Sequence, residues 1–272
     1  MLRTRVIVAA ILLPIGLVII YLGGWFFSAF VTLIVGLAAW EYSQIFRGSG
    51  YQPALVIAIA GAAFLALGRA YNGFDSAPLL ISLILLISMT YHMVAFERGR
   101  DQAGTDFAVT FSAAIYIGWL GAYLISIRTL AEGFWWILLV LPTVWLADSG
   151  AYFIGRSFGR HKLSPRLSPK KTWEGYLGGV VVGTLGAVGL TYLWQIWAGP
   201  EFSITPLQAA LLGFLLSTIT TLGDLGESMI KRQSGVKDSS NLIPGHGGVF
   251  DRIDSWLWAA LIGYYFIIWV VI

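Results

Sequence analysis

Long apolar runs follow one another along almost the whole chain, and they constrain its fold more than any other feature. A helix needs about 20 mostly apolar residues to cross the roughly 30 Å hydrocarbon core of a membrane. Nine runs approach or meet that length, and they cover residues 6–22, 25–40, 53–71, 78–96, 107–127, 134–154, 176–197, 207–223 and 256–272. The sequence therefore predicts an all-α, polytopic integral membrane protein with about nine transmembrane helices.

The composition excludes other classes of protein. Hydrophobic residues make up 57% of the 272 residues and charged residues only 11%, whereas soluble domains carry about 25% charged residues. Cysteine is absent and the three histidines lie far apart, which argues against a zinc site and leaves oxygen ligands for any metal. We expect a single integral membrane domain over residues 1–272, and no nucleic-acid partner.

The distribution of basic residues predicts the orientation. Fifteen of the 17 Lys and Arg residues lie at the N-terminus or in loops on the same side of the membrane, and only Arg69 and Arg128 lie on the other side. The positive-inside rule then places the N-terminus in the cytoplasm and the C-terminus outside. Residues 1–140 are expected to be mainly scaffold helices, and residues 141–272 to carry an active site in two polar cytoplasmic segments.

The segment 224–254 contains five acidic and four basic residues within 31 positions. If a helix continues past residue 223, one of its faces carries four polar side chains, Asp224, Glu227, Ser228 and Lys231. A Gly-rich turn follows at 244–248, and backbone N–H groups in such turns bind phosphate oxygens. Capping or orientation explains each feature alone, but the density of charge favours a site for phosphate and a cation.

The segment 148–174 begins with Asp148, which lies inside a predicted span, where a carboxylate costs about 2.5–3.5 kcal/mol on insertion scales. A basic loop follows and ends at residues 168–175, Ser-Pro-Lys-Lys-Thr-Trp-Glu-Gly. Lys170 and Lys171 are the favoured phosphate contacts there. The remaining basic residues of the loop are better explained by orientation or by attraction to anionic lipid; examples are Arg160, Lys162 and Arg166.

Residues 228–254 resemble the signature of the phosphatidate cytidylyltransferases, or CDP-diacylglycerol synthases. The matching polar, Gly and Pro positions include Ser228, Lys231, Arg232, Lys237, Asp238, Pro244, His246, Gly247, Gly248, Asp251, Arg252 and Asp254. Residues 148–152 and 168–175 are similar to that family's secondary motifs. The resemblance implies an enzyme that converts CTP and phosphatidate into CDP-diacylglycerol and pyrophosphate with Mg²⁺. It also implies a homodimer in the inner membrane, with the site on the cytoplasmic side.

Roles for individual residues follow from that resemblance. Mg²⁺ usually takes one or two carboxylates together with phosphates and waters, so Asp224 and Asp251 are the leading ligands. Asp148, Glu227 and Asp254 are second-rank candidates. A second cation would suit the negative charge of the attacking and leaving groups. The predicted catalytic residues are Asp224, Asp251, Lys231 and Arg252. The predicted substrate-binding residues are Lys170, Lys171, Ser228, Arg232, Lys237, His246, Gly247 and Gly248, with His246 either a ligand or a structural donor.

The predicted chemistry needs no general base. The second pKa of a phosphate monoester is near 6, so the lipid phosphate is already nucleophilic and attacks the α-phosphate of CTP in line.

Three different functions compete with this prediction. The main alternative, which is not an enzyme, is a multi-pass transporter or channel. The two halves of the chain, however, show no pair of broken helices, which would be typical of a transporter. A cytidylyltransferase that acts on a different lipid phosphate would use the same chemistry. An enzyme that consumes a CDP-alcohol is disfavoured, because its Asp-Gly-x-x-Ala-Arg motif does not occur in the chain.

Small residues recur at steps of four in the predicted span 176–197 and just before it. They are Gly175, Gly179, Gly183 and Ala187. Such a ladder allows helices to approach closely, either within one chain or between two.

Overall fold

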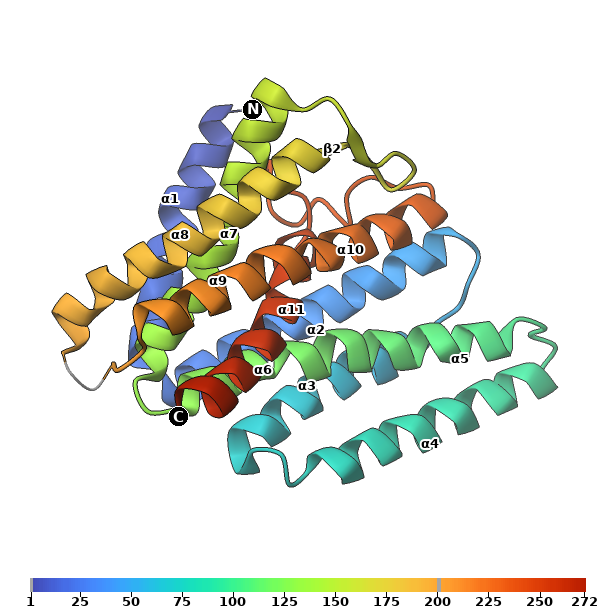
Figure 1. Cartoon of the computed structure of the whole chain (residues 1–272). Helices are drawn as coiled ribbons and strands as arrows, with labels where there is room; N and C mark the ends of the chain where they lie inside the picture. The colour runs from blue at the N-terminus through green and yellow to red at the C-terminus, as the bar shows by residue number, and fades with distance from the viewer. Residues whose placement is uncertain (1, 200–201) are drawn as a thin grey trace. The chain divides into compact units, whose positions relative to one another are not determined.

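The computed structural model describes residues 2–199 and 202–272, without the side chains of residues 2–5 and 9. Arg3 and Arg5, which contribute to the predicted orientation, lie outside the described side chains. Within these ranges, eight helices are long and apolar enough to cross a membrane, and Val6–Leu22 is a shorter apolar helix. Each of the nine predicted spans overlaps a helix, and the all-α polytopic class is confirmed (Figure 1).

The chain divides into two compact units, Met1–Ser126 with Ile230–Ile253, and Ile127–Met229 with Asp254–Ile272. The first unit contains α1 (Leu2–Leu22), α2 (Gly24–Gly48), α3 (Leu55–Asn72), α4 (Ala77–Glu97), α5 (Ala103–Ser112) and the π-helical η1 (Ala113–Trp119). The second contains α7 (Gly133–Phe158), β1 (Lys162–Ser164), β2 (Ser168–Thr172), α8 (Trp173–Ala198), α9 (Pro206–Ile219) and η2 (Ile267–Val271). Three helices have residues in both units, α6 (Tyr123–Thr129), α10 (Thr221–Gln233) and α11 (Phe250–Phe266).

Small residues allow close helix packing in the first unit, where α3 packs against α2 and η1. Ala58 and Ala62 of α3 are fully buried. A Cβ atom at Gly118 of η1 would lie only 2.4 Å from the Cα atom of Ala62, so a larger residue at 118 would separate the two helices. The packing therefore depends on contact between backbones, as is common in membranes.

The small-residue ladder of α8 is used within the second unit, where α8 packs against α7 and α9. A Cβ atom at Gly179 would lie 2.7 Å from the carbonyl oxygen of Ala147 in α7. One at Gly183 would lie 2.0 Å from Ser217 Oγ in α9. The close approach left open by the sequence is thus an approach within one chain.

A two-stranded antiparallel hairpin, β1–β2, connects α7 and α8, and it was not expected from the sequence. Thr172 caps α8, because its Oγ1 accepts a hydrogen bond from the Gly175 N–H at 3.2 Å. Glu174 accepts hydrogen bonds from the N–H groups of Arg160, at 3.0 Å, and His161, at 3.2 Å. Two residues of the 168–175 motif therefore hold the hairpin to the start of α8.

Candidate active site

An acidic cluster in the second unit contains Asp148 of α7, Asp224 of α10 and Asp254 of α11. Lys171 of β2 forms an ion pair with Asp224, with 2.7 Å between Nζ and Oδ2. Asp148 and Asp254 interact electrostatically with both members of this pair. Gly223 allows α10 to approach α11, because a Cβ atom there would lie 2.7 Å from the carbonyl oxygen of Asp254. The second unit thus brings together three predicted metal ligands and one predicted phosphate contact.

The condition set for the polar face is met, because α10 runs past residue 223 to Gln233. Ser228 Oγ lies 3.4 Å from Asp224 Oδ1, as expected for two side chains four residues apart on one helix face. Glu227 and Ser228 are buried, with 3% and 9% of their surfaces exposed. Lys231 lies one further turn along the same helix, in the first unit.

Asp251 is the centre of a second cluster, which lies in the first unit. Its Oδ1 is 2.6 Å from Lys231 Nζ, in a pair of which little is exposed to solvent. Its Oδ2 accepts hydrogen bonds from the Ser239 N–H and Oγ–H, both at 2.9 Å, and from the Gly248 N–H at 2.8 Å. Asp251 therefore ties the loop 234–249 to the side chain of Lys231, and donors of the protein itself occupy both of its oxygens.

Glu41 of α2 is a site residue that was not predicted from the sequence. Its side chain is fully buried and accepts four hydrogen bonds. The donors are Ser240 Oγ at 2.5 Å, Phe250 N at 2.6 Å, Val249 N at 2.9 Å and Ser239 Oγ at 3.0 Å. The only indication in the sequence is an acid directly after the apolar run 25–40, in the part of the chain that the sequence predicts to be scaffold; a carboxylate at the edge of a span normally has partners.

The Gly-rich turn at 244–248 is shaped by these carboxylates. Gly247 has a φ of 80°, which favours glycine. A Cβ atom at Gly248 would lie 2.1 Å from Ser239 Oγ and 2.5 Å from both oxygens of Glu41. The N–H groups of residues 246, 248, 249 and 250 donate hydrogen bonds within the protein. In contrast, Nδ1 of His246 is buried and has no hydrogen-bond partner among the described residues, so its capacity to form a hydrogen bond is not used there.

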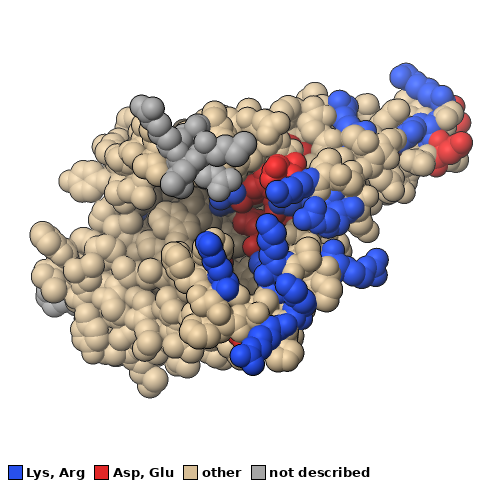
Figure 2. Space-filling model, turned by 90° about the horizontal axis from the view of Figure 1, so that it is seen from above, with Lys and Arg blue, Asp and Glu red and all other residues tan. Residues whose placement is uncertain are grey.

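The remaining predicted site residues are Lys170, Arg232, Lys237 and Arg252, and all four are exposed. Much of the surface in Figure 2 is uncharged, and the Lys, Arg, Asp and Glu side chains gather in limited areas of it. Across residues 2–199 and 202–272, no three Asp, Glu or His side chains are gathered tightly enough to form a metal site. The donors of the acidic cluster are nevertheless carboxylate oxygens, which is the ligand type that Mg²⁺ prefers.

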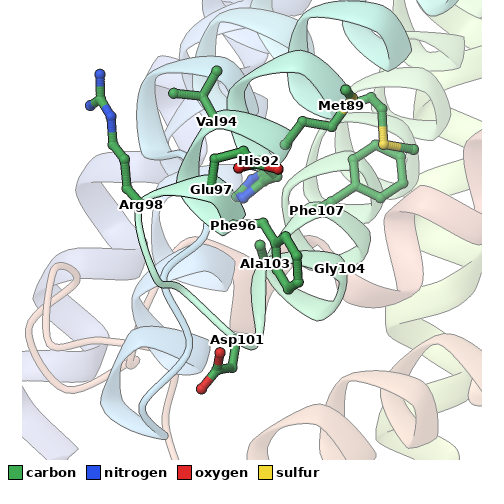
Figure 3. Close-up of a pocket in the computed structure, with 11 residues that line it drawn as sticks. Met89, His92, Val94, Phe96, Glu97, Arg98, Asp101, Ala103, Gly104 and Phe107 are labelled. Carbon is green, nitrogen blue, oxygen red and sulfur yellow. The ribbon is translucent and has the colours of Figure 1, made fainter.

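A pocket of about 670 Å³ lies in the first unit, where α4 ends and α5 begins (Figure 3). Met89, His92 and Phe107 line it, and His92 Nε2 is 2.9 Å from Thr110 Oγ1. None of the predicted site residues lines this pocket. It is therefore not the site that the motifs predict.

The chain is similar to known proteins along most of its length. A profile described as the cytidylyltransferase family matches residues 3–270. The chain is 40% identical over 267 residues to a phosphatidate cytidylyltransferase of Pseudomonas aeruginosa, covering 94% of this chain and 93% of the relative. It is 34% identical over 301 positions to that of Synechocystis, covering 97% and 96%, and 33% identical over 269 positions to that of Brucella suis, covering 97% and 93%. The resemblance seen in the motifs is confirmed, and a transporter or channel is not favoured.

Proposed function

Because the chain belongs to the cytidylyltransferase family, we propose that it transfers the cytidylyl group of CTP to phosphatidate and releases pyrophosphate. The match along residues 3–270 is the observation that carries this proposal. The charged clusters support it, because two polyanionic substrates require cations and N–H donors. The product of the reaction is CDP-diacylglycerol.

The transfer is a single in-line displacement. A phosphate oxygen of phosphatidate forms a bond to the α-phosphorus of CTP, and the bond between that phosphorus and the oxygen bridging to the β-phosphate breaks. The lipid phosphate is mostly dianionic at neutral pH, so no side chain needs to remove a proton. The task of the protein is to hold the two phosphates in line and to offset the developing charge.

The residues of the second unit supply one part of this environment. Lys171 and Asp224 are both partly exposed, at 27% and 34% of their side chains, so that an anion and a cation can reach them. Lys171 would contact phosphate oxygens. Asp224 is the leading Mg²⁺ ligand, with Asp148 and Asp254 as its acidic neighbours. When bound, Mg²⁺ would offset negative charge on the triphosphate and on the leaving pyrophosphate, and a second ion would add to this.

The residues of the first unit supply donors for the triphosphate. His246 offers the buried Nδ1 atom, which favours its role as a ligand. Positive charge for the triphosphate comes from the exposed residues Arg232, Lys237 and Arg252, and from Lys231. Asp251 remains a proposed metal ligand, but its carboxylate is held by Lys231 and the loop, so binding a cation requires it to exchange at least one of these contacts.

The cellular setting of the reaction belongs to the same proposal. The apolar helices place the protein in a membrane, where phosphatidate keeps its acyl chains. The distribution of basic residues supports a site on the cytoplasmic side, where CTP is available, and the inner membrane is proposed from the family resemblance. A homodimer is proposed from the family resemblance alone, because the small-residue ladder of α8 is already occupied by contacts within the chain.

The direct test uses purified protein in vesicles that contain phosphatidate, with CTP and Mg²⁺. Pyrophosphate and CDP-diacylglycerol are expected to form in equal amounts, and diacylglycerol, which has no phosphate, should support neither. Addition of EDTA should stop the reaction. Failure to form either product, with protein shown to be folded, would overturn the proposal. Efficient use of another lipid phosphate in preference to phosphatidate would change the assigned substrate but not the reaction.

A further inference from the structure

Glu41 has a set of contacts that a scaffold helix does not need. Burying an ionised carboxylate is unfavourable unless hydrogen bonds compensate it. All four donors of Glu41 come from residues 239–250, about 200 positions further along the chain. None of them belongs to α2 itself. The contacts therefore serve the loop and the start of α11, and not the stability of α2.

Two of these donors are the N–H groups of Val249 and Phe250, at the start of α11. The first N–H groups of a helix have no partner within the helix, and a negative charge near them is favourable. Glu41 thus acts as the N-terminal cap of α11 from a distant segment. Its neighbour Tyr42 adds an edge-to-face contact with the Phe250 ring, at 5.7 Å between ring centroids.

Glu41 and Asp251 hold the loop from two sides. Ser239 Oγ lies between them, 3.0 Å from Glu41 and 2.9 Å from Asp251, and shares its single proton between the two carboxylates. The Gly248 N–H donates a hydrogen bond to Asp251, and because glycine has no side chain, Glu41 has space beside it. The two acids together hold residues 239–240 and residues 248–250, which lie on either side of the turn 244–248.

We infer that Glu41 is a positioning residue for CTP: it holds the turn that presents His246 to the triphosphate. This rests on the proposed function, in which that turn binds the nucleotide. Glu41 itself does not touch the substrate. The inference assigns part of CTP binding to a helix that the sequence places in the scaffold.

The test compares Glu41→Gln, Glu41→Asp and Ser240→Ala with Ser43→Ala, a matched control. Ser43 is buried on the same helix, but among the described residues its hydroxyl bonds only to the carbonyl of Ala39 in α2. Glu41→Gln should raise the KM for CTP at least tenfold and leave the KM for phosphatidate within twofold. Glu41→Asp, which keeps the charge, should restore part of this loss. Ser240→Ala should raise the KM for CTP severalfold, and Ser43→Ala should leave it unchanged.

Two further measurements separate positioning from general stability. Amide hydrogen exchange in residues 245–250 should accelerate in Glu41→Gln and Ser240→Ala. Adding Ser240→Ala to Glu41→Gln should have little further effect, because the two changes break the same contact.

The inference is overturned if Glu41→Gln and Ser240→Ala leave the KM for CTP at its original value in an active enzyme, or raise both KM values equally. If Glu41→Gln does not fold, Glu41→Asp and Ser240→Ala decide the matter by the same criterion. An inactive original protein would instead refute the proposed function. Hydrogen exchange would then still report whether Glu41 holds the loop.

Discussion

Replacing Gly248 with alanine tests the packing of the Gly-rich turn against its carboxylates. The added Cβ atom would lie 2.1 Å from Ser239 Oγ and 2.5 Å from the oxygens of Glu41, whereas ordinary contacts begin at 3.4 Å. The loop must therefore move by about 1 Å away from two side chains that bind it. Unlike Gly247, Gly248 does not have a positive φ, so the effect is steric and not conformational.

The expected magnitude follows from this overlap. Overpacking a well-packed site costs about 1–3 kcal/mol. At about 1.4 kcal/mol for each factor of ten, this cost lowers the population of the closed loop roughly 5- to 150-fold relative to open forms. The hydrogen bonds that the Gly248, Val249 and Phe250 N–H groups donate to carboxylates open in the same step.

Hydrogen exchange and steady-state kinetics measure this change together. In Gly248→Ala, amide exchange in residues 248–250 should accelerate by that factor, and kcat/KM for CTP should fall. Gly189→Ala is the control, because an added Cβ in the middle of α8 meets nothing within 4 Å. Unchanged exchange in Gly248→Ala would refute the packing argument. Faster exchange with normal kinetics for CTP would show that the turn does not bind the nucleotide.

Further predictions concern charged residues. Asp224→Asn should lower turnover by several orders of magnitude and weaken the dependence on Mg²⁺, as measured by pyrophosphate release, without loss of folded protein. Asp251→Asn should lower turnover similarly and also accelerate hydrogen exchange in the loop 234–249. Asp106→Asn should destabilise the protein by about 3 kcal/mol, seen as a lower midpoint of thermal unfolding, because the carboxylate is fully buried and pairs with Arg100 at 2.7 Å. Arg160→Ala should leave turnover nearly unchanged, because the side chain is exposed and only the main-chain N–H of this residue donates a hydrogen bond to Glu174 of α8.

The membrane helices could be predicted from the sequence because hydrocarbon imposes a single rule. Every spanning segment must be apolar and long enough, and this rule is local. The shared face of Asp224 and Ser228 could also be predicted, on the condition that a helix runs past Gly223, and α10 meets that condition. The β1–β2 hairpin could not, because its strands are short and polar, and the side chain of Glu174 helps to hold them.

The acidic cluster was partly predictable, because the residues involved are unusual in apolar surroundings and stand out by charge. Their partners were not predictable. Nothing near Lys171 in the sequence indicates a pair with Asp224, and nothing near Glu41 indicates donors some 200 residues away. The glycines at 247 and 248 were expected to bind phosphate. In the structure, the space beside Gly247 is filled by the carboxylate of Asp251, and the space beside Gly248 by that of Glu41. Only the tertiary structure shows these contacts.

The anchoring of α11 by Glu41 also has a consequence for biosynthesis. During translation, α2 emerges long before residues 239–250. The carboxylate of Glu41 can therefore form its hydrogen bonds only after this later segment has been synthesised. A chain that stops short of this loop leaves Glu41 without these four donors, so any part of the carboxylate that stays buried is uncompensated. Truncated products that lack the loop should therefore be less stable than the loss of α11 alone would make them, and α2 acquires its final contacts only after residues 239–250 have been synthesised.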